Sequence, residues 1–330
     1  MALIERCSPN FEGPTPSADA LRGGLPVVLR LRHGGEAATT IRYEIAGPSA
    51  APLLLVAGGI SAGRHVVASR AFPESGWWQA QRRAFEGCRV LAMDWVGADG
   101  AVDRPIDPSD QAEAMVRLLD HLGIETLLAS VGASYGAMVG MHLAVSHPRR
   151  IGGLLAISGA ASAHPYSSAC RALQRRTISL GEAAGDAAAG VALARSLAML
   201  TYRTAAEFEG RFTEEPSLVG DRLRVAAEDY LDIQGERHAR RMSATAYRRL
   251  SESIDLHRID GARLQLPVTV VGVDHDALVP PADSRALADS ISDARFDLIE
   301  SLYGHDAFLK EERQVAAIIT RFLSSLEQHP

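Results

Sequence analysis

Ser134 stands in the pentapeptide Gly132-Ala133-Ser134-Tyr135-Gly136, between the short apolar run 127–131 and an Ala- and Met-rich segment with helical spacing. A G-x-S-x-G sequence that joins a strand to a helix is typical of a sharp turn that exposes a nucleophilic serine. Glycines on both sides leave room for neighbouring atoms that a Cβ would crowd. We therefore expect Ser134 to act as a nucleophile at the carboxyl edge of a sheet. The alternative is a tight Gly-rich turn with an inert serine.

A serine hydroxyl needs a general base to remove its proton, and that base is usually a histidine held by a carboxylate. His305 follows the apolar run 295–300, in a Gly-containing loop that precedes a helical pattern. This position after the last expected strand predicts that His305 is the base. His65 and His275 are the alternatives, and the remaining histidines are expected to be surface or hydrogen-bonded structural residues.

The carboxylate that orients the histidine is expected after strand 267–273, where the sequence continues Asp274-His275-Asp276. Asp276 is favoured because it lies a few residues beyond the strand, so that its side chain can reach the site from a loop. Asp274 competes with it, and either residue could instead be a turn aspartate bonded to its own backbone. The chain order Ser, Asp, His is that of the α/β-hydrolase fold.

Two backbone N–H groups are predicted to bind the negative oxygen that develops during acyl transfer. One belongs to Tyr135, the residue after the nucleophile. The other is assigned to Ile60, in the glycine-rich loop 58–63 that follows the buried strand 52–57. A phosphate-binding loop is disfavoured there because the lysine of a Walker motif is absent.

The composition narrows the possible partners and cofactors. A net charge of -6 gives no electrostatic basis for nucleic-acid binding. Three scattered cysteines and the lack of an H-E-x-x-H pattern predict that no metal is bound. The sequence shows neither a signal-peptide pattern nor an 18-residue apolar run, so we expect a soluble cytoplasmic protein that does not associate with membranes.

Short apolar runs alternate with helical patterns along most of the chain, which predicts an α/β fold with a doubly wound, mostly parallel sheet. Between about residues 161 and 260 Ala, Arg, Glu and Leu dominate, and no strand is expected. We predict an irregular N-terminal arm over 1–26, an α/β-hydrolase core over 27–160 and 261–330, and a helical lid over 161–260. Two early strands of the core are expected to form an antiparallel edge.

Several longer motifs resemble those of the homoserine O-acyltransferases, enzymes of the α/β-hydrolase fold that act in methionine biosynthesis. These motifs are GASYGAMVGM at 132–141, Leu200-Thr201-Tyr202-Arg203, Gln234-Gly235-Glu236 and Tyr303-Gly304-His305-Asp306-Ala307-Phe308-Leu309. The resemblance covers most of the chain after about residue 40. It implies ping-pong transfer of an acyl group from acetyl-CoA or succinyl-CoA, through Ser134, to L-homoserine. Acyl-CoA is then a co-substrate, and no bound cofactor is implied.

The resemblance also implies substrate contacts. Arg195 matches the lid arginine that binds the amino-acid carboxylate, and Asp306 matches the residue that holds the substrate ammonium. Arg195 could instead be a surface helix residue, and Asp306 could cap a helix. Leu278, two residues after Asp276, stands where acetyl users have Leu and succinyl users have Arg, which favours acetyl-CoA. Arg64 or another basic side chain could still bind a succinyl carboxylate.

The helical lid is also a candidate homodimer surface, again by resemblance. Residues 95–100 depart from the family pattern near the expected donor tunnel, which leaves the donor and the acceptor open. Three alternatives to a homoserine O-acyltransferase remain. They are a serine O-acyltransferase of the same family, an esterase or thioesterase with the same catalytic residues, and a non-catalytic protein on this scaffold.

Overall fold

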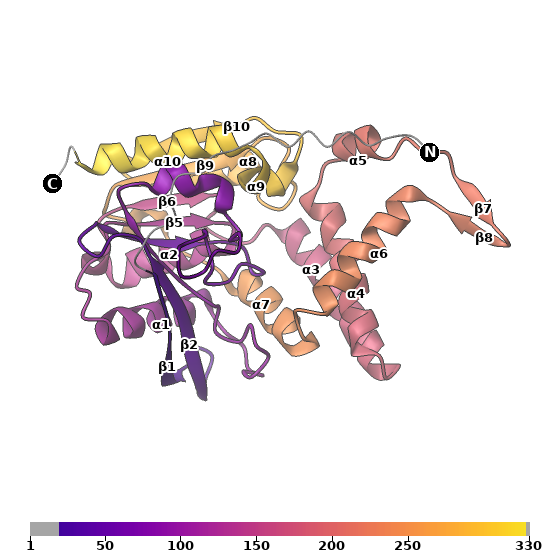
Figure 1. Ribbon diagram of the computed structural model, residues 1–330, viewed down its shortest axis with the longest axis horizontal. Coiled ribbons are helices and arrows are strands. Elements are labelled where there is room, and N and C mark those ends of the chain that lie inside the picture. Colours follow the sequence, from indigo (N-terminus) through magenta and orange to yellow (C-terminus); the bar gives the residue numbers. More distant parts are fainter. Residues whose placement is uncertain (1–19, 328–330) are drawn as a thin grey trace.

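The computed structural model describes residues 20–327, which form an eight-stranded sheet with helices on both faces (Figure 1). Along the sheet the strands follow the order β1-β2-β4-β3-β5-β6-β9-β10. β2 is antiparallel to β1 and to β4, and the strands from β4 to β10 are parallel. The strands are β1 Ala20–Arg30, β2 Glu36–Ala46, β3 Leu53–Ala57, β4 Arg89–Met93, β5 Ala129–Ala133, β6 Leu154–Ile157, β9 Val268–Val273 and β10 Arg295–Ile299.

Helices cover both faces of this sheet. α1, α2 and α8 pack on one face, and η1 and α10 cover the other (Figure 1). In chain order these and the shorter helical segments of the core are η1 Gln79–Phe85, α1 Pro108–His121, α2 Tyr135–Ser146, η2 Pro148–Arg150, η3 Gly261–Arg263, α8 Pro281–Asp289, η4 Gly304–Asp306, α9 Ala307–Lys310 and α10 Glu312–Glu327.

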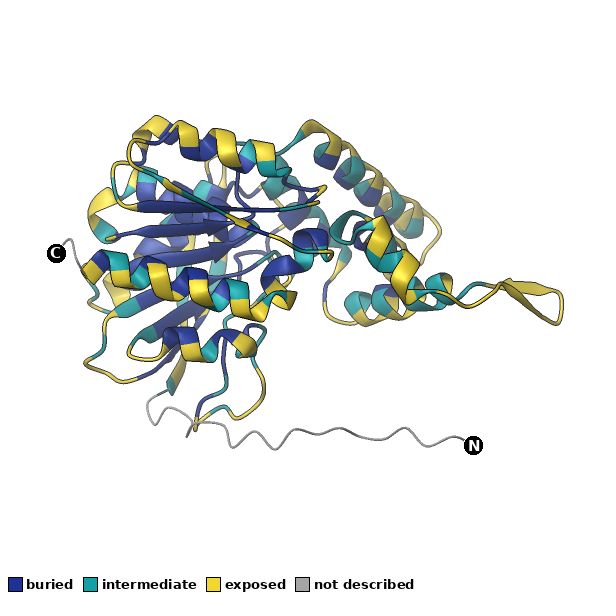
Figure 2. Ribbon diagram, turned by 90° about the horizontal axis from the view of Figure 1, so that it is seen from above, coloured by how far each residue is buried: buried dark blue, intermediate teal, exposed yellow. Residues whose placement is uncertain are grey.

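The central strands are buried on both faces, as their continuous apolar sequences predict. Successive residues of a strand point to opposite faces of the sheet. In β3, Leu54 and Val56 therefore join the apolar cluster under α10, whereas Leu55 and Ala57 join the cluster under α1 and α2. Figure 2 shows the buried strands between helices whose outer sides are exposed. The fold class predicted from the sequence, a mostly parallel α/β-hydrolase sheet with a helical lid insertion, is confirmed.

The parallel direction of β3, β5, β9 and β10 places their C-terminal ends at one edge of the sheet. Loops at this edge are where open α/β sheets bind their ligands. The glycine-rich loop follows β3, Ser134 follows β5, Asp276 follows β9 and His305 follows β10. The topology therefore brings segments that are far apart in the sequence to one site.

Between β6 and β9 the chain leaves the sheet and forms a group of helices beside it (Figure 1). We call the segment 161–260 the lid. The prediction that no strand lies in the lid is wrong, because a hairpin of β7 Ser217–Val219 and β8 Arg222–Arg224 turns at Gly220 and Asp221. Gly220 adopts φ +66°, as such two-residue turns require. The lid helices are α3 Pro165–Ala183, α4 Ala187–Tyr202, α5 Ala205–Arg211, α6 Ala226–Ala239 and α7 Ala244–Leu256.

The first strand is longer than the sequence pattern suggested. β1 begins at Ala20, so the predicted irregular arm is wrong for residues 20–26, and residues 1–19 lie outside the described part of the chain. Gly23 and Pro26 obscured the strand pattern. A Cβ at Gly23 would lie 2.3 Å from the Tyr43 ring, so glycine gives that ring its space. The expected antiparallel edge is formed by β1 and β2.

Within residues 20–327, no helix has the length and apolar character that a membrane span needs.

Candidate active site

Ser134 lies at the turn between β5 and α2, with φ 54° and ψ -118°. A positive φ is strained for a residue that carries a Cβ, so the surrounding chain must enforce it. A Cβ at Gly132 would lie 2.5 Å from the carbonyl oxygen of Gly136, and a Cβ at Gly136 would lie 2.2 Å from that of Ala57. The turn therefore requires glycine at both positions, and it exposes Ser134 to a cavity at the sheet edge.

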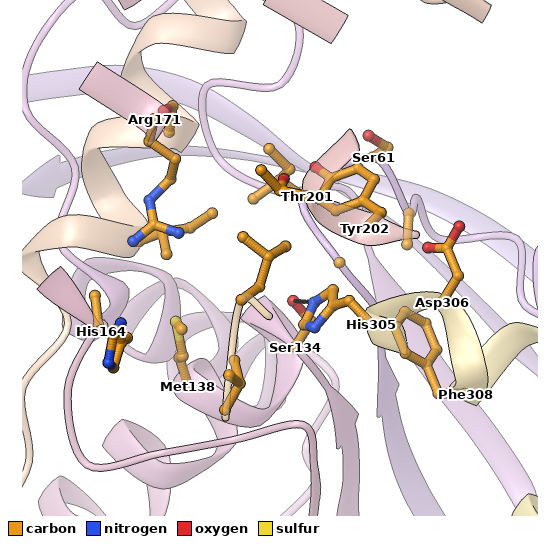
Figure 3. Close-up of a pocket in the computed structure, with 18 of the residues that line it drawn as sticks. Ser61, Ser134, Met138, His164, Arg171, Thr201, Tyr202, His305, Asp306 and Phe308 are labelled. Carbon is orange, nitrogen blue, oxygen red and sulfur yellow. Dashed lines mark hydrogen bonds between the residues drawn. The ribbon is translucent and has the colours of Figure 1, made fainter. Parts of the chain in front are cut away.

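Ser134, His305 and Asp276 form a row of hydrogen bonds. His305 Nε2 lies 2.8 Å from Ser134 Oγ (Figure 3), and His305 Nδ1 lies 2.7 Å from Asp276 Oδ2. The second carboxylate oxygen, Oδ1, accepts the N–H groups of Leu278 at 2.8 Å and Val279 at 2.9 Å. Because both carboxylate oxygens have partners, the imidazole is held with Nε2 facing the serine. This is the geometry that a nucleophile, a base and an orienting carboxylate need.

The environment of His305 changes its affinity for a proton. Burial lowers the pKa of His305, but the charge of the Asp276 carboxylate and its hydrogen bond oppose this effect. The net result is a pKa of His305 above its usual value. A carboxylate beside a buried imidazole thus makes it a stronger base.

The alternative candidates for the base and for the orienting carboxylate do not reach Ser134. Asp274 accepts a hydrogen bond from the N–H of His275, and that histidine is exposed. His65 binds the Glu44 carboxylate and the backbone carbonyl of Glu74. Neither histidine joins the row at Ser134. In the described part of the chain no three His, Cys, Asp or Glu side chains are grouped so that they could hold a metal ion.

The two amides predicted to bind an oxyanion belong to segments that are bonded together. The N–H of Gly136 donates to the carbonyl oxygen of Gly58 at 2.9 Å, which ties the serine turn to the glycine-rich loop. Tyr135 is the first residue of α2, so its N–H has no acceptor within the helix. Across residues 20–327, neither this N–H nor that of Ile60 donates to a protein group. Both are therefore available to a substrate oxygen.

The Trp95 side chain holds the glycine-rich loop through a hydrogen bond. Its indole N–H donates to the carbonyl oxygen of Gly59 at 3.0 Å, and its ring packs edge-on against Tyr135 with 4.9 Å between ring centroids. The C=O and N–H of a trans peptide point in opposite directions. Holding the Gly59 carbonyl therefore sets the direction of the Ile60 N–H. No sequence motif pointed to Trp95, which stood out only as part of a departure from the family pattern.

A cavity of about 210 Å³ lies above Ser134, between the sheet edge and the lid (Figure 3). Its apolar lining includes Met138, Ala160, Ile254, Leu278, Val279 and Phe308, and its polar lining includes Arg171, Gln174, Arg195, Ser251, Asp283 and Asp306. A second cavity of about 390 Å³ shares Ile60, Ser61, Ala62 and Arg195 with the first. The predicted site residues with side-chain roles thus meet at one cavity, apart from Asp276, which lies behind His305.

Arg195 lies on α4 and lines both cavities. The central carbon of its guanidinium lies 4.9 Å from the centroid of the Tyr202 ring. That ring in turn stacks on His305, with 6.0 Å between centroids. Arg195 is therefore connected to the base through an aromatic side chain. Tyr202 belonged to a family motif in the sequence, but its position against His305 was not foreseen.

Asp306 and Leu278 both line the first cavity. Asp306 Oδ2 lies 2.8 Å from Arg203 Nε, an ion-pair distance without the alignment of a hydrogen bond. Asp306 precedes α9, yet its side chain makes no capping hydrogen bond to that helix. Leu278 is buried in the apolar wall. Arg64, considered as a partner for a succinyl carboxylate, pairs with Asp94 and does not line this cavity.

Comparison with known proteins agrees with this geometry. The family model of the α/β hydrolase fold matches residues 52–312. The chain is 48% identical over 336 residues to a homoserine O-succinyltransferase from Xanthomonas campestris pv. campestris, covering 98% of this chain and 91% of that protein. It is 36% identical over 232 residues to a homoserine O-acetyltransferase from Thermus thermophilus, covering 66% of this chain and 58% of that protein.

A solved structure supports the fold. The crystal structure of a homoserine O-acetyltransferase from Staphylococcus aureus superimposes with a TM-score of 0.79 at 22% identity, covering 92% of this chain and 95% of that one. The high identity to the Xanthomonas protein over nearly the whole length of both chains shows the family. The chain therefore belongs to the homoserine O-acyltransferases, a family of acyltransferases with the α/β-hydrolase fold.

Proposed function

We propose that this protein transfers an acyl group from acyl-CoA to the hydroxyl of L-homoserine, and that Ser134 carries the acyl group between the two substrates. The observation that supports this most directly is the row of Ser134, His305 and Asp276 beside a cavity that Arg195 and Asp306 line. An arginine and an aspartate match the two charged ends of an amino acid. The relatives from Xanthomonas and Thermus are both named for homoserine and differ in the named acyl group.

In the first half-reaction His305 Nε2 removes the proton of Ser134 Oγ while this oxygen attacks the carbonyl carbon of the thioester. The electron pair of the C=O bond moves onto oxygen, where the N–H groups of Ile60 and Tyr135 stabilise it. When the carbonyl re-forms, the C–S bond breaks and protonated His305 gives its proton to the leaving sulfur. Asp276 stabilises the imidazolium between these two proton transfers.

In the second half-reaction the homoserine hydroxyl gives its proton to His305 and attacks the acyl carbon, and Ser134 leaves with the proton. We assign the substrate carboxylate to Arg195 and its ammonium to Asp306. Arg203 already pairs with Asp306, so the ammonium would share that carboxylate with Arg203. A carboxylate has two oxygens with about four lone-pair positions, which allows this sharing.

The second cavity fits the phosphate-bearing part of acyl-CoA. Besides Arg195, which is assigned to homoserine, its lining includes Arg42, Arg237 and Arg241. Arg42 pairs with Asp99, but within residues 20–327 neither Arg237 nor Arg241 forms an ion pair with a carboxylate. Guanidinium groups bind phosphate through paired N–H donors. Acyl-CoA enters this proposal as a co-substrate, and no bound cofactor takes part.

The identity of the acyl group depends on the cationic side chains of the first cavity. Leu278 lies in its apolar wall, which favours the acetyl donor predicted from the sequence. The relative from Xanthomonas, which aligns with 98% of this chain, is named a succinyltransferase. A succinyl group ends in a carboxylate, and such a group needs a cationic or strongly hydrogen-bonding partner inside the protein.

The proposal is tested by the release of free thiol from acetyl-CoA and from succinyl-CoA, with and without L-homoserine. Release that depends on homoserine, with formation of the O-acyl product, is the expected result. Release at the same rate without homoserine would instead indicate a thioesterase. L-serine is a necessary second acceptor, because faster transfer to serine would identify a serine O-acyltransferase.

We also propose that the lid forms the surface of a homodimer. Many of the large apolar side chains that are exposed in the structure belong to the lid. They are Tyr166, Leu173, Leu180, Leu193, Leu200, Leu218, Val219, Leu223 and Ile233. Clusters of exposed apolar side chains are typical of protein–protein contacts. Sedimentation equilibrium at micromolar protein should give the mass of two chains, and the mass of one chain would contradict this surface.

A further inference from the structure

We infer that Arg171 selects the acyl donor by binding the distal carboxylate of a dicarboxylic acyl group, such as succinyl, while the thioester end lies at Ser134. This inference rests on the proposed acyl transfer and adds a specificity residue to it. It gives the cavity a partner for a second carboxylate although position 278 is Leu.

Arg171 lies on the lid helix α3 and lines the same cavity as Ser134. Only 8% of the residue is exposed, so its guanidinium is withdrawn from bulk water. Figure 3 shows this guanidinium on one side of Ser134 and His305, with Tyr202 and Asp306 on the other side. The cavity thus has two polar ends with the nucleophile between them. One end suits the acyl group and the other suits the amino acid.

Within residues 20–327, Arg171 shares its carboxylate partner with a second arginine. Arg171 Nη2 lies 2.7 Å and Nε 2.8 Å from Asp255 Oδ1, and Arg175 Nη1 lies 2.8 Å from Asp255 Oδ2. Two guanidinium groups therefore share one carboxylate, which leaves a net positive charge. A buried charge is costly unless it is paired. A substrate carboxylate at this position would supply the missing partner.

Arg171 also has N–H groups that donate no hydrogen bond within residues 20–327. Its Nε and Nη2 atoms donate to Asp255 and Ser168, but Nη1 donates to no group within residues 20–327. Gln174 lies one helical turn further along α3, is buried and lines the same cavity. Its Oε1 lies 3.0 Å from the Tyr247 hydroxyl, while its amide nitrogen donates to no described acceptor. These unused N–H groups can bind the two oxygens of a carboxylate.

The remaining cations are less suitable. Arg195 lies next to Tyr202, toward the end of the cavity assigned to homoserine. Arg175 shares Asp255 with Arg171 but does not line the cavity. The carboxylates of Asp283 and Asp306 also line the cavity, and Asp306 is paired with Arg203. Arg171 is close enough to the reaction centre for its charge to oppose the increase in the pKa of His305.

The test compares succinyl-CoA with butyryl-CoA, which has the same chain length but ends in a methyl group. The rate of acyl-enzyme formation on Ser134 is measured by intact-protein mass spectrometry without an acceptor, so the result does not depend on homoserine. For Arg171→Met, the ratio of succinyl to butyryl rates should fall by at least about 30-fold, the effect of a lost charged hydrogen bond. Arg171→Lys keeps the charge and should recover part of the ratio.

Arg176→Met is the matched control. It removes an exposed arginine of the same helix that neither pairs with Asp255 nor lines the cavity, so the donor ratio should stay within about 3-fold of wild type. Thermal unfolding of each variant reports whether the lid remains folded. A wild-type enzyme that reacts with butyryl-CoA and not with succinyl-CoA would overturn the inference, as would equal losses on both donors in Arg171→Met. If Arg171 selects the donor but L-homoserine does not accelerate loss of the acyl group from Ser134, the proposed acceptor is refuted and the inference about Arg171 stands.

Discussion

The indole N–H of Trp95 holds the carbonyl of Gly59 at 3.0 Å, and the peptide to which this carbonyl belongs also carries the Ile60 N–H. Trp95 thereby connects the body of the sheet to one of the two amides assigned to the oxyanion. The same indole ring packs against Tyr135, which supplies the other amide. One buried side chain therefore contacts both segments that carry these donors, and it shares the Gly59 carbonyl with the N–H of Ala62.

Replacing Trp95 with Phe keeps an aromatic ring against Tyr135 but removes the hydrogen bond to Gly59. We expect kcat to fall about 10-fold, because a displaced oxyanion donor stabilises the transition state less. Steady-state kinetics with a saturating acyl donor measures this change. Trp77→Phe is the control, because it removes an indole bond to the carbonyl of Gly63, a peptide that does not carry the Ile60 N–H. An equal loss in both variants would mean that general loop stability, and not the Gly59 peptide, matters.

The pKa of His305 sets the pH dependence of the reaction. Only the neutral imidazole can accept the serine proton, and the pKa of His305 is raised above 6.5. The rate should therefore fall as the pH decreases through a value above 6.5. Asp276→Asn removes the main causes of the increase and leaves only the smaller effect of the Asp306 charge against the burial that lowers the pKa of His305, so the acid limb should move to lower pH. The plateau rate should also fall, on the order of 10,000-fold.

Asp274→Asn is the control for this pH profile, because Asp274 is the neighbouring aspartate outside the hydrogen-bonded row. Its profile of kcat/KM against pH should match that of the wild type. An acid limb that stays in place in Asp276→Asn would show that Asp276 does not control the proton affinity of His305.

The serine turn should not tolerate a methyl group at Gly136. In Gly136→Ala the new Cβ would meet the backbone carbonyl of Ala57 at 2.2 Å, and backbone cannot move aside cheaply. We expect the free energy of unfolding to fall by more than about 2 kcal/mol, measured from the urea midpoint. Gly210→Ala is the control, because no atom lies within 4 Å of its added Cβ, and it should be neutral or slightly stabilising. Equal midpoints for the two variants would contradict the packing described for the turn.

Arg195→Ala separates binding of the amino acid from acylation. If Arg195 holds the homoserine carboxylate, the KM for homoserine should rise at least about 10-fold, while acyl-enzyme formation changes much less. Arg176→Ala removes an exposed arginine of α3 that does not line the cavity, and both quantities should stay near wild type. A similar loss in both half-reactions of Arg195→Ala would assign this residue a structural role.

Much of the site was predictable because its residues follow local signals. Ser134 lies between two glycines after a buried strand, and His305 and Asp276 follow later strands in the expected chain order. The choice of Asp276 over Asp274 agrees with the geometry because only the loop position beyond the strand reaches the imidazole. Such signals are readable because a strand, its loop and the next helix are contiguous in sequence.

The other residues reach the site only through tertiary packing. Trp95 contacts the glycine-rich loop from the segment after β4, and Arg171 and Tyr202 meet His305 or the cavity only when the lid packs on the sheet. No spacing in the sequence encodes these contacts. The hairpin at Gly220 was missed for a different reason, because the helical composition around it outweighed a short turn signal.

The central claim is that Ser134 carries the acyl group to homoserine, and intact-protein mass spectrometry tests it most directly. Mixing the enzyme with acyl-CoA in the absence of acceptor should add the mass of one acyl group, located on Ser134 by peptide mapping. Addition of L-homoserine should discharge this adduct much faster than water does, and Ser134→Ala should form no adduct. An adduct that persists in Ser134→Ala, or one that is lost equally fast with and without homoserine, would contradict the account.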